Sequence, residues 1–555
     1  MTNKHHFNQM KNIVLLLLII ITCPVKASPF TDNYPKNTNI DAINYVFRLK
    51  LSDSIDEIQC EETVEIRYLA EGETSLRLDL VKASKKMGNK GMTISKVISD
   101  GKRLEYTHED DVLVIHLPEP SKANQYSRYV ISYRGVPAAG LKIDDNKYGD
   151  RTFFSDNWPN KGRNWLATID HPYDKATCEF IVIAPSKYQV VSNGLKVEET
   201  DIPNGQRLTH WKQSVPIATW LYVLGVARFA VQYVDEFDGK SIETWVYPQN
   251  KDAGFYDFAI PTKRVLEFFS DWVGPYSYEK LANIQSNSVS GGMEAASAIL
   301  YSEKSVVGNR NERWRNVVIH EIAHQWFGNA VTEFDWDDVW LSEGFATYFT
   351  LLFIEHEYGH DEFMRGLKKS KQIAIDFQAK NPDYRIVHDN LTDMSKVTTV
   401  QTYQKGSWIL HMLRGVVGTD VFWKGIRAYY KKYKDLNATT ADFIREMEKA
   451  SGLDLDYFFK QWLYEPGMLK YQGSWTYDDR KKEVFIRLDQ VQEDGSVFKM
   501  PMEIGVYGTN GEQLIKRLMV DKKSFKAKIE IDFEPVRVVL DPNDWVLMEA
   551  DFRRE

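Results

Sequence analysis

The sequence contains little cysteine: three residues in a chain of 555. Cys23 lies in the N-terminal segment, so Cys60 and Cys178 are the two that a processed chain would keep. An exported compartment permits such a pair to form a disulfide. Two cysteines in so long a chain are equally well explained as small buried hydrophobic residues. A disulfide is therefore not predicted.

An excess of positive charge is also missing. The 70 lysines and arginines are outnumbered by 78 aspartates and glutamates, which gives a formal net charge of −8. No basic cluster offsets this balance, so the sequence argues against nucleic acid as a partner. There is no internal repeat or low-complexity tract. The composition, 43% hydrophobic and 27% charged, is that of an ordinary globular protein, and the length predicts several domains.

No apolar run has the roughly 20 residues that a membrane-spanning helix needs. The run from Ile13 to Ile21 is shorter, follows a positively charged stretch and precedes the small-residue site Val25-Lys26-Ala27. This order is typical of a secretory signal peptide. We expect residues 1–27 to be that peptide, the mature chain to have no stable membrane span, and the protein to be periplasmic or secreted. A lipoprotein anchored at Cys23 is the alternative.

A His-Glu-x-x-His motif is the strongest chemical signal. His320 and His324 are four residues apart, so both imidazoles lie on one face of a helix and can bind one metal ion. Residues 317–327 are largely apolar, which favours a buried helix. Glu321 can reach a water on the metal and act as general base. Such a motif also arises by chance on helices rich in histidine and glutamate, so it needs further support.

Glu343 provides that support. It lies eighteen intervening residues beyond His324, in a second apolar and helix-prone run that can return antiparallel to the first. Two histidines, one carboxylate and a position left for water form the catalytic rather than the structural zinc pattern. We therefore predict one Zn²⁺ per chain, bound by His320, His324 and Glu343, with Glu321 as the base that deprotonates water.

Together with three further stretches, this motif resembles the gluzincin zinc aminopeptidases, the family of aminopeptidase N and leukotriene A4 hydrolase. Gly291-Gly292-Met293-Glu294 is similar to the family's exopeptidase signature. Tyr403-Gln404-Lys405-Gly406 is similar to the segment of its catalytic tyrosine, and residues 458–467 to the end of its catalytic domain. The likeness covers nearly the whole mature chain.

The resemblance implies an α+β multidomain fold in a short, three-domain form. Residues 28–235 alternate in polarity between turn signals, as β-strands do, and match the family's N-terminal β-saddle. Residues 236–466 show helical periodicity, with Pro261 to Val273 as an early helix, and match its thermolysin-like α/β catalytic domain. Residues 467–555 alternate again, contain the hairpin signal Asn510-Gly511, and are predicted to form a C-terminal β-sandwich.

Within the catalytic domain the resemblance implies three roles. Gly291, Gly292 and Met293 form the edge of a small sheet, where glycines let a substrate strand approach closely. Glu294 pairs with the free α-ammonium of a peptide, because a peptide without a nearby amine would leave this carboxylate desolvated and unpaired. Tyr403 donates to the carbonyl oxygen that gains negative charge during attack.

Three positions in these stretches depart from the family pattern. Trp158 occupies the position of a glutamine or glutamate that helps to hold the substrate amine, and Asp156, two residues earlier, is the candidate substitute. Ala295 replaces an asparagine that commonly follows the signature glutamate, and Ser342 replaces another just before the third ligand.

The predicted function is a zinc-dependent aminopeptidase that hydrolyses the N-terminal residue from peptides with a free N-terminus. Two alternatives stay open: a zinc endopeptidase in which Glu294 has no role, and a non-catalytic exported peptide-binding protein. Ser395 and Thr398 replace an aspartate and a tyrosine used by the leukotriene-hydrolysing member, which disfavours epoxide hydrolysis. The sequence does not predict an oligomeric state.

Overall fold

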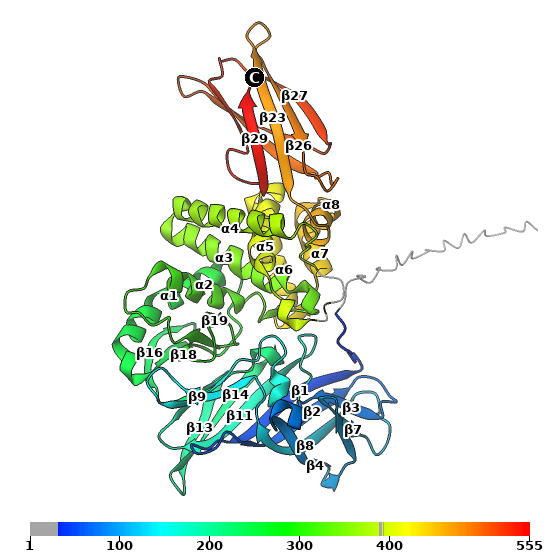
Figure 1. Ribbon diagram of the computed structural model, residues 1–555, viewed down its shortest axis with the longest axis vertical. Coiled ribbons are helices and arrows are strands. Elements are labelled where there is room, and N and C mark those ends of the chain that lie inside the picture. Colours follow the sequence, from blue (N-terminus) through cyan, green and yellow to red (C-terminus); the bar gives the residue numbers. More distant parts are fainter. Residues whose placement is uncertain (1–31, 388–390, 392) are drawn as a thin grey trace, which may run out of the picture.

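The computed structural model describes residues 32–387, 391 and 393–555, arranged in three parts along the long axis of the molecule (Figure 1). Strands coloured blue to cyan form the N-terminal part, green and yellow helices the middle, and orange to red strands the C-terminal part. The predicted fold class, an α+β multidomain protein, is confirmed. The predicted signal peptide, residues 1–27, lies outside the described residues.

The N-terminal part is built on an eight-stranded sheet with the order β13-β14-β11-β1-β2-β8-β4-β5. Its central strand β11 alternates strictly between buried and half-buried residues, which is why its sequence alternates in polarity. The strands are β1 (Ile40–Lys50), β2 (Ile58–Tyr68), β4 (Gly91–Ser99), β5 (Lys102–Arg103), β8 (Gln125–Val136), β11 (Lys175–Pro185), β13 (Leu195–Ile202) and β14 (Gln206–Ala218).

Two smaller sheets complete this part. A four-stranded sheet has the order β12 (Gln189–Ser192), β15 (Leu224–Ala227), β10 (Arg151–Ser155) and β9 (Leu141–Asp145). A three-stranded sheet has the order β3 (Ser75–Asp79), β7 (Val112–His116) and β6 (Tyr106–Glu109). Cys60 and Cys178 are both buried and unpaired, so of the two possibilities left open by the sequence the structure has the small buried thiols.

The middle part places helices against a five-stranded sheet of order β16 (Ala230–Phe237), β17 (Lys240–Val246), β18 (Lys280–Ser286), β20 (Ala298–Ser302) and β19 (Gly292–Met293). Its helices are α1 (Lys251–Trp272), α2 (Glu312–His324), α3 (Trp340–Tyr358), α4 (His360–Lys380), α5 (Val400–Val417), α6 (Thr419–Tyr433), α7 (Thr440–Ser451) and α8 (Asp456–Phe459). Two short strands, β21 (Val331–Glu333) after α2 and β22 (Leu436–Ala438) after α6, pair with each other. None of the described helices is long and apolar enough to cross a membrane.

Helix α1 begins ten residues earlier than the sequence indicated. The apolar periodicity of the sequence predicted an early helix from Pro261 to Val273. The helix instead begins at Lys251 and continues through Pro261. Next to the proline, the Thr262 hydroxyl donates to the Phe258 carbonyl at 2.9 Å, so the side chain pairs a backbone group in the turn that the proline disturbs.

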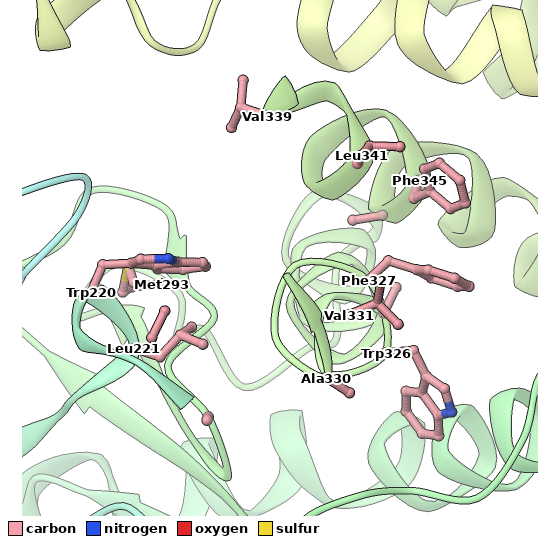
Figure 2. Close-up of a cluster of buried hydrophobic side chains, with 14 of the residues drawn as sticks. Trp220, Leu221, Met293, Trp326, Phe327, Ala330, Val331, Val339, Leu341 and Phe345 are labelled. Atoms are coloured by element: carbon pink, nitrogen blue, oxygen red, sulfur yellow. The ribbon is translucent and has the colours of Figure 1, made fainter. Parts of the chain in front are cut away.

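An aromatic core fixes the two helices that matter most for the site. Phe327, just after α2, packs on Phe345 and Phe349 of α3 with ring centroids 4.8 and 4.5 Å apart. Figure 2 shows Phe327 and Phe345 within this buried cluster. Phe443 of α7 meets Phe345 at 5.0 Å. Because buried aromatic rings contribute large apolar areas and specific packing, the ends of α2 and α3 are held rigidly together.

The C-terminal part contains two sheets, as predicted for a β-sandwich. One has the order β27 (Ser524–Glu530), β24 (Glu483–Gln490), β23 (Leu469–Asp478) and β29 (Met548–Arg554). The other has the order β26 (Gln513–Val520), β25 (Met500–Tyr507) and β28 (Arg537–Leu540). The β25–β26 hairpin turns at Asn510-Gly511, where Gly511 adopts a φ of 88° that favours glycine.

Candidate metal centre

Helices α2 and α3 bring the three predicted ligands together. His320 and His324 lie one turn apart on α2, and their Nε2 atoms are 3.1 Å apart. Glu343 lies in the first turn of α3, with Oε2 at 3.4 Å from His320 Nε2 and 3.2 Å from His324 Nε2. The three ligand atoms therefore form a compact triangle in the interior.

This triangle fits zinc. Bonds of about 2.0–2.1 Å in a tetrahedral arrangement place neighbouring ligand atoms about 3.3 Å apart, close to the observed 3.1–3.4 Å. Glu343 Oε2 is buried and accepts no hydrogen bond of ordinary geometry from the part of the chain that the structure describes. A buried carboxylate oxygen without such a partner calls for a cation.

The second ring nitrogen of His324 is held by two oxygens. Nδ1 lies 3.1 Å from the Phe327 carbonyl and 3.1 Å from the Ser342 hydroxyl. An Nδ1–H that donates to the carbonyl leaves the Nε2 lone pair free for the metal. Ser342, noted in the sequence only as a departure from the family pattern, thus orients a ligand, and its place directly before Glu343 was the only signal of that role.

Glu321 lies beside the ligands and is buried. A Cβ on Gly292 would lie 2.3 Å from the Glu321 carboxyl carbon, so only glycine allows β19 to pass this close to the candidate base. Burial, reinforced by the negative charge of Glu294, raises the pKa of Glu321 well above its ordinary value. A raised pKa makes the Glu321 carboxylate a stronger base, which suits a role in taking a proton from water.

Strand β19 is the free edge of its sheet, as the sequence predicted for the segment of Gly291, Gly292 and Met293. It pairs with β20 on one side only, with Gly292 opposite Tyr301. A cavity of about 310 Å³ lies along it and is lined by all four signature residues, including Glu294, and by Glu343 and Tyr403. An extended peptide can therefore add to this edge as a further strand.

Glu294 is held in place by two residues that follow helix α2. Its carbonyl accepts hydrogen bonds from Gln325 Nε2 at 2.9 Å and from Asn329 Nδ2 at 2.6 Å. Gln325 Oε1 in turn accepts from the Ser297 amide at 3.0 Å. From the N-terminal part, Asn193 Nδ2 donates to the Ala296 carbonyl at 2.7 Å. The signature carboxylate is thus tied to the metal ligands by buried amides that the sequence had not singled out.

Tyr403 lies on α5 and faces the ligands. Its hydroxyl donates to Glu343 Oε1 at 2.7 Å, and its ring stacks against His320 at 6.1 Å between centroids. Burial and the charge of Glu343 raise the pKa of the phenol well above its usual value. Tyr403 therefore stays neutral and able to donate a hydrogen bond at physiological pH.

One departure from the family pattern, Trp158, and its candidate substitute Asp156 border the same cavity. Trp158 lines it and packs edge-on against Trp220 and Trp336, with ring centroids at 4.7 and 5.1 Å. Asp156 lines it as well. Ala295 is buried at 1% exposure, in the turn that Gln325 and Asn329 hold.

A second group of metal-ligating side chains, Asp32, His171 and Asp335, is already occupied by a cation from the chain. The Lys36 ammonium lies 2.7 Å from Asp32 and 2.5 Å from Asp335, and His171 Nε2 lies 2.7 Å from Asp32. This group joins the start of the described chain to the segment that precedes α3.

Two protein-family profiles match the chain. The profile of the peptidase family M1 domain matches residues 258–462, and that of the peptidase M1 N-terminal domain matches residues 41–221. The glutamyl aminopeptidase of Rattus norvegicus is 30% identical over 325 residues, which are 56% of this chain and 34% of that protein. Probable aminopeptidase 1 of Sulfurisphaera tokodaii is 24% identical over 522 residues, 89% of this chain and 62% of that protein.

The chain thus spans about a third of the length of the first of these relatives and less than two thirds of the second. A crystal structure of the M1 zinc metallopeptidase from Deinococcus radiodurans superimposes with a TM-score of 0.66 at 23% identity, covering 77% of this chain and 93% of that one. This likeness supports the fold.

Zinc binding should release protons. Burial lowers the pKa of His324, but the charges of Glu294 and Glu343 outweigh burial and raise that pKa to about 10. Below this pH the metal-free protein holds His324 as imidazolium, whereas zinc needs the neutral ring. We expect at least one proton to leave per zinc bound at about pH 7.5, and the affinity to rise about tenfold per pH unit up to about pH 10. Calorimetry in two buffers of different ionisation enthalpy measures the release, and equal heats in both buffers would contradict the expectation.

Proposed function

The chain belongs to peptidase family M1, and on that premise we propose that it is a zinc-dependent aminopeptidase that removes the N-terminal residue from peptides with a free N-terminus. One observation carries the proposal: Glu343 of a zinc-fitting ligand triangle and a second buried carboxylate, Glu294, border the same cavity along a free sheet edge. The metal favours hydrolysis of an amide, and the carboxylate favours an amine beside it.

In the proposed reaction, His320, His324 and Glu343 hold one zinc ion per chain. When bound, zinc supplies Lewis-acid chemistry that acidifies water and polarises the scissile carbonyl. Glu321 accepts the proton of the attacking water and passes it to the leaving amine. Tyr403 donates its hydroxyl hydrogen to the carbonyl oxygen as negative charge develops there.

Glu294 sets the register of cleavage in this proposal. Burial raises its pKa to about 7, although the positive charge of His324 opposes that rise. An α-ammonium group placed next to the carboxylate restores the ionised form and satisfies the buried charge, whereas an acylated amine does not. Gln325 and Asn329 fix the Glu294 backbone to the segment that follows α2, and so fix its distance from the metal ligands. A peptide whose amine lies at Glu294 then presents the carbonyl of its first residue to the metal.

We further propose that the protein is exported and that residues 1–27 are removed. The support is the order of a charged stretch, an apolar run and a small-residue site in the sequence. N-terminal sequencing of the protein recovered outside the cytoplasm should then begin at Ser28. A mature chain that begins at Cys23 and carries lipid would establish the lipoprotein alternative instead.

Replacing the base should abolish turnover without removing the metal. For Glu321→Gln we expect kcat on aminoacyl amides to fall by about 10²–10⁴-fold, because the amide cannot accept the proton of water. Zinc content by elemental analysis should stay equal to that of the wild type. Glu312→Gln, on the exposed start of the same helix, is the matched control and should keep full activity. Full activity of Glu321→Gln would remove this residue from the mechanism.

The free amine should be required. We expect the wild type to cleave aminoacyl amides and to leave their N-acetylated forms intact, and Glu294→Ala to lose about 10–100-fold in kcat/KM on the free amines only, the value of a charged hydrogen bond. Cleavage rates for each substrate pair measure both effects. Equal cleavage of acetylated and free substrates by the wild type would favour the endopeptidase, and no cleavage of either by zinc-loaded protein would favour the binding protein.

A further inference from the structure

Beside the cavity at the metal centre lies a second cavity of about 380 Å³, and three residues line both: Asp156, Lys161 and Ser288. The second cavity is otherwise bordered by residues 136–143 of the N-terminal part, together with Asp56 and Lys90. The three shared residues are therefore a wall between the two spaces.

Backbone contacts hold the wall in place, and an ion pair joins two of its side chains. The Asp156 amide donates to the Gly140 carbonyl at 2.7 Å, and the Ser288 hydroxyl donates to the Ser155 carbonyl at 2.9 Å. A Cβ on Gly140, whose φ is 76°, would lie 2.2 Å from the Lys161 carbonyl, so these two loops touch at their backbones. Across the remaining opening, Lys161 Nζ donates to Asp156 Oδ2 at 2.7 Å.

The wall and Glu294 border the same cavity. The lining of the first cavity includes Glu343 and Tyr403 at the metal centre, Glu294 beyond β19, and Asp156 and Lys161 from the N-terminal part. Asp156 is close enough to Glu294 for its charge to add to the effect of burial, which raises the Glu294 pKa. A peptide that extends β19 with its first amine at Glu294 directs any group attached to that amine toward the ion pair.

We propose that the Asp156–Lys161 ion pair is a specificity-determining wall that closes the amine end of the cleft and excludes peptides whose N-terminus is acylated. This inference rests on the proposed aminopeptidase function. Glu294 disfavours acylated peptides because they lack the positive charge of a free amine, and the wall disfavours them because the acyl group would collide with it. The second cavity beyond the wall has room for an acyl group, so removing the wall would give that group access to the cavity.

The ion pair is suited to mutation because it contributes little to the fold. Its side chains are 39% and 28% exposed, and partly exposed pairs of this kind are screened by solvent. Lys161→Ala shortens the wall, whereas Lys161→Arg keeps the charge and the length. Lys187→Ala is the matched control: Lys187 pairs with Asp53 at 2.9 Å, is 48% exposed and borders neither cavity.

The test compares kcat/KM for an aminoacyl amide and for its N-acetyl form in these variants, each with wild-type zinc content and unfolding temperature. We expect Lys161→Ala to raise the acetylated-to-free ratio at least tenfold, and Lys161→Arg and Lys187→Ala to keep the wild-type ratio. Asp156→Asn removes the acidic partner of the ion pair and should also raise the acetylated-to-free ratio. This variant tests the proposal if Lys161→Ala does not fold.

The outcomes separate the two proposals. A wild-type ratio in both Lys161→Ala and Asp156→Asn would overturn the wall while leaving the aminopeptidase intact, because the free-amine substrate would still be cleaved. A wild type that already cleaves both substrates equally would overturn the wall together with the role of Glu294. A ratio raised equally in Lys187→Ala would show that the effect comes from the loss of any surface lysine, and would also overturn the wall.

Discussion

His320, His324 and Glu343 place three ligand atoms 3.1–3.4 Å apart in the protein interior, and this arrangement is unfavourable without a positive charge at its centre. In the metal-free state a proton supplies that charge, because the surrounding carboxylates raise the pKa of His324. With zinc bound, the proton is replaced. The packing of Phe327 on Phe345 and Phe349 holds α2 and α3 at the separation that this exchange requires.

The same rigidity extends to the substrate amine. In the proposed reaction, the position of Glu294 relative to the metal determines which carbonyl is attacked, and a displacement of one residue along an extended strand is about 3.3 Å. Gln325 and Asn329 tie the Glu294 backbone to residues just beyond the second histidine, within one continuous segment of chain. The distance from Glu294 to the metal ligands is therefore set by contacts within the middle part of the molecule. The N-terminal part contributes one further hydrogen bond, from Asn193 to the Ala296 carbonyl.

The metal ligands could be predicted because they follow from residue spacing. The residues that hold these ligands and Glu294 by long-range hydrogen bonds could not. The four-residue interval of His320 and His324 and the apolar run around Glu343 determine where the ligands lie, so the triangle could be expected. Gln325, Asn329 and Ser342 act through side-chain hydrogen bonds to residues distant in the sequence, and such bonds leave no periodic pattern, so these roles emerge only in the folded chain.

The start of one helix was predicted wrongly. Apolar periodicity indicated an early helix from Pro261 to Val273, yet α1 begins at Lys251 and passes through Pro261, where the Thr262 hydroxyl donates to the Phe258 carbonyl. The resemblance to a family likewise aligned Trp158 with an amine ligand. In the structure its ring belongs to an aromatic cluster with Trp220 and Trp336, so at that position the indole supplies a firm surface.

Charge and volume act on the same end of the cleft for a physical reason. Asp156, Glu294, Glu321 and Glu343 all border or adjoin the site, and the lysine side chain of Lys161 is the one cation of the described cavity lining. A cleft so rich in carboxylates attracts an ammonium group, and attraction alone also draws in cationic side chains from the middle of a peptide. Discrimination between an α-ammonium and a lysine side chain then requires a boundary at a fixed distance from the metal. The proposed Asp156–Lys161 wall is such a boundary, and the close backbone contact of Gly140 with Lys161 holds it in place.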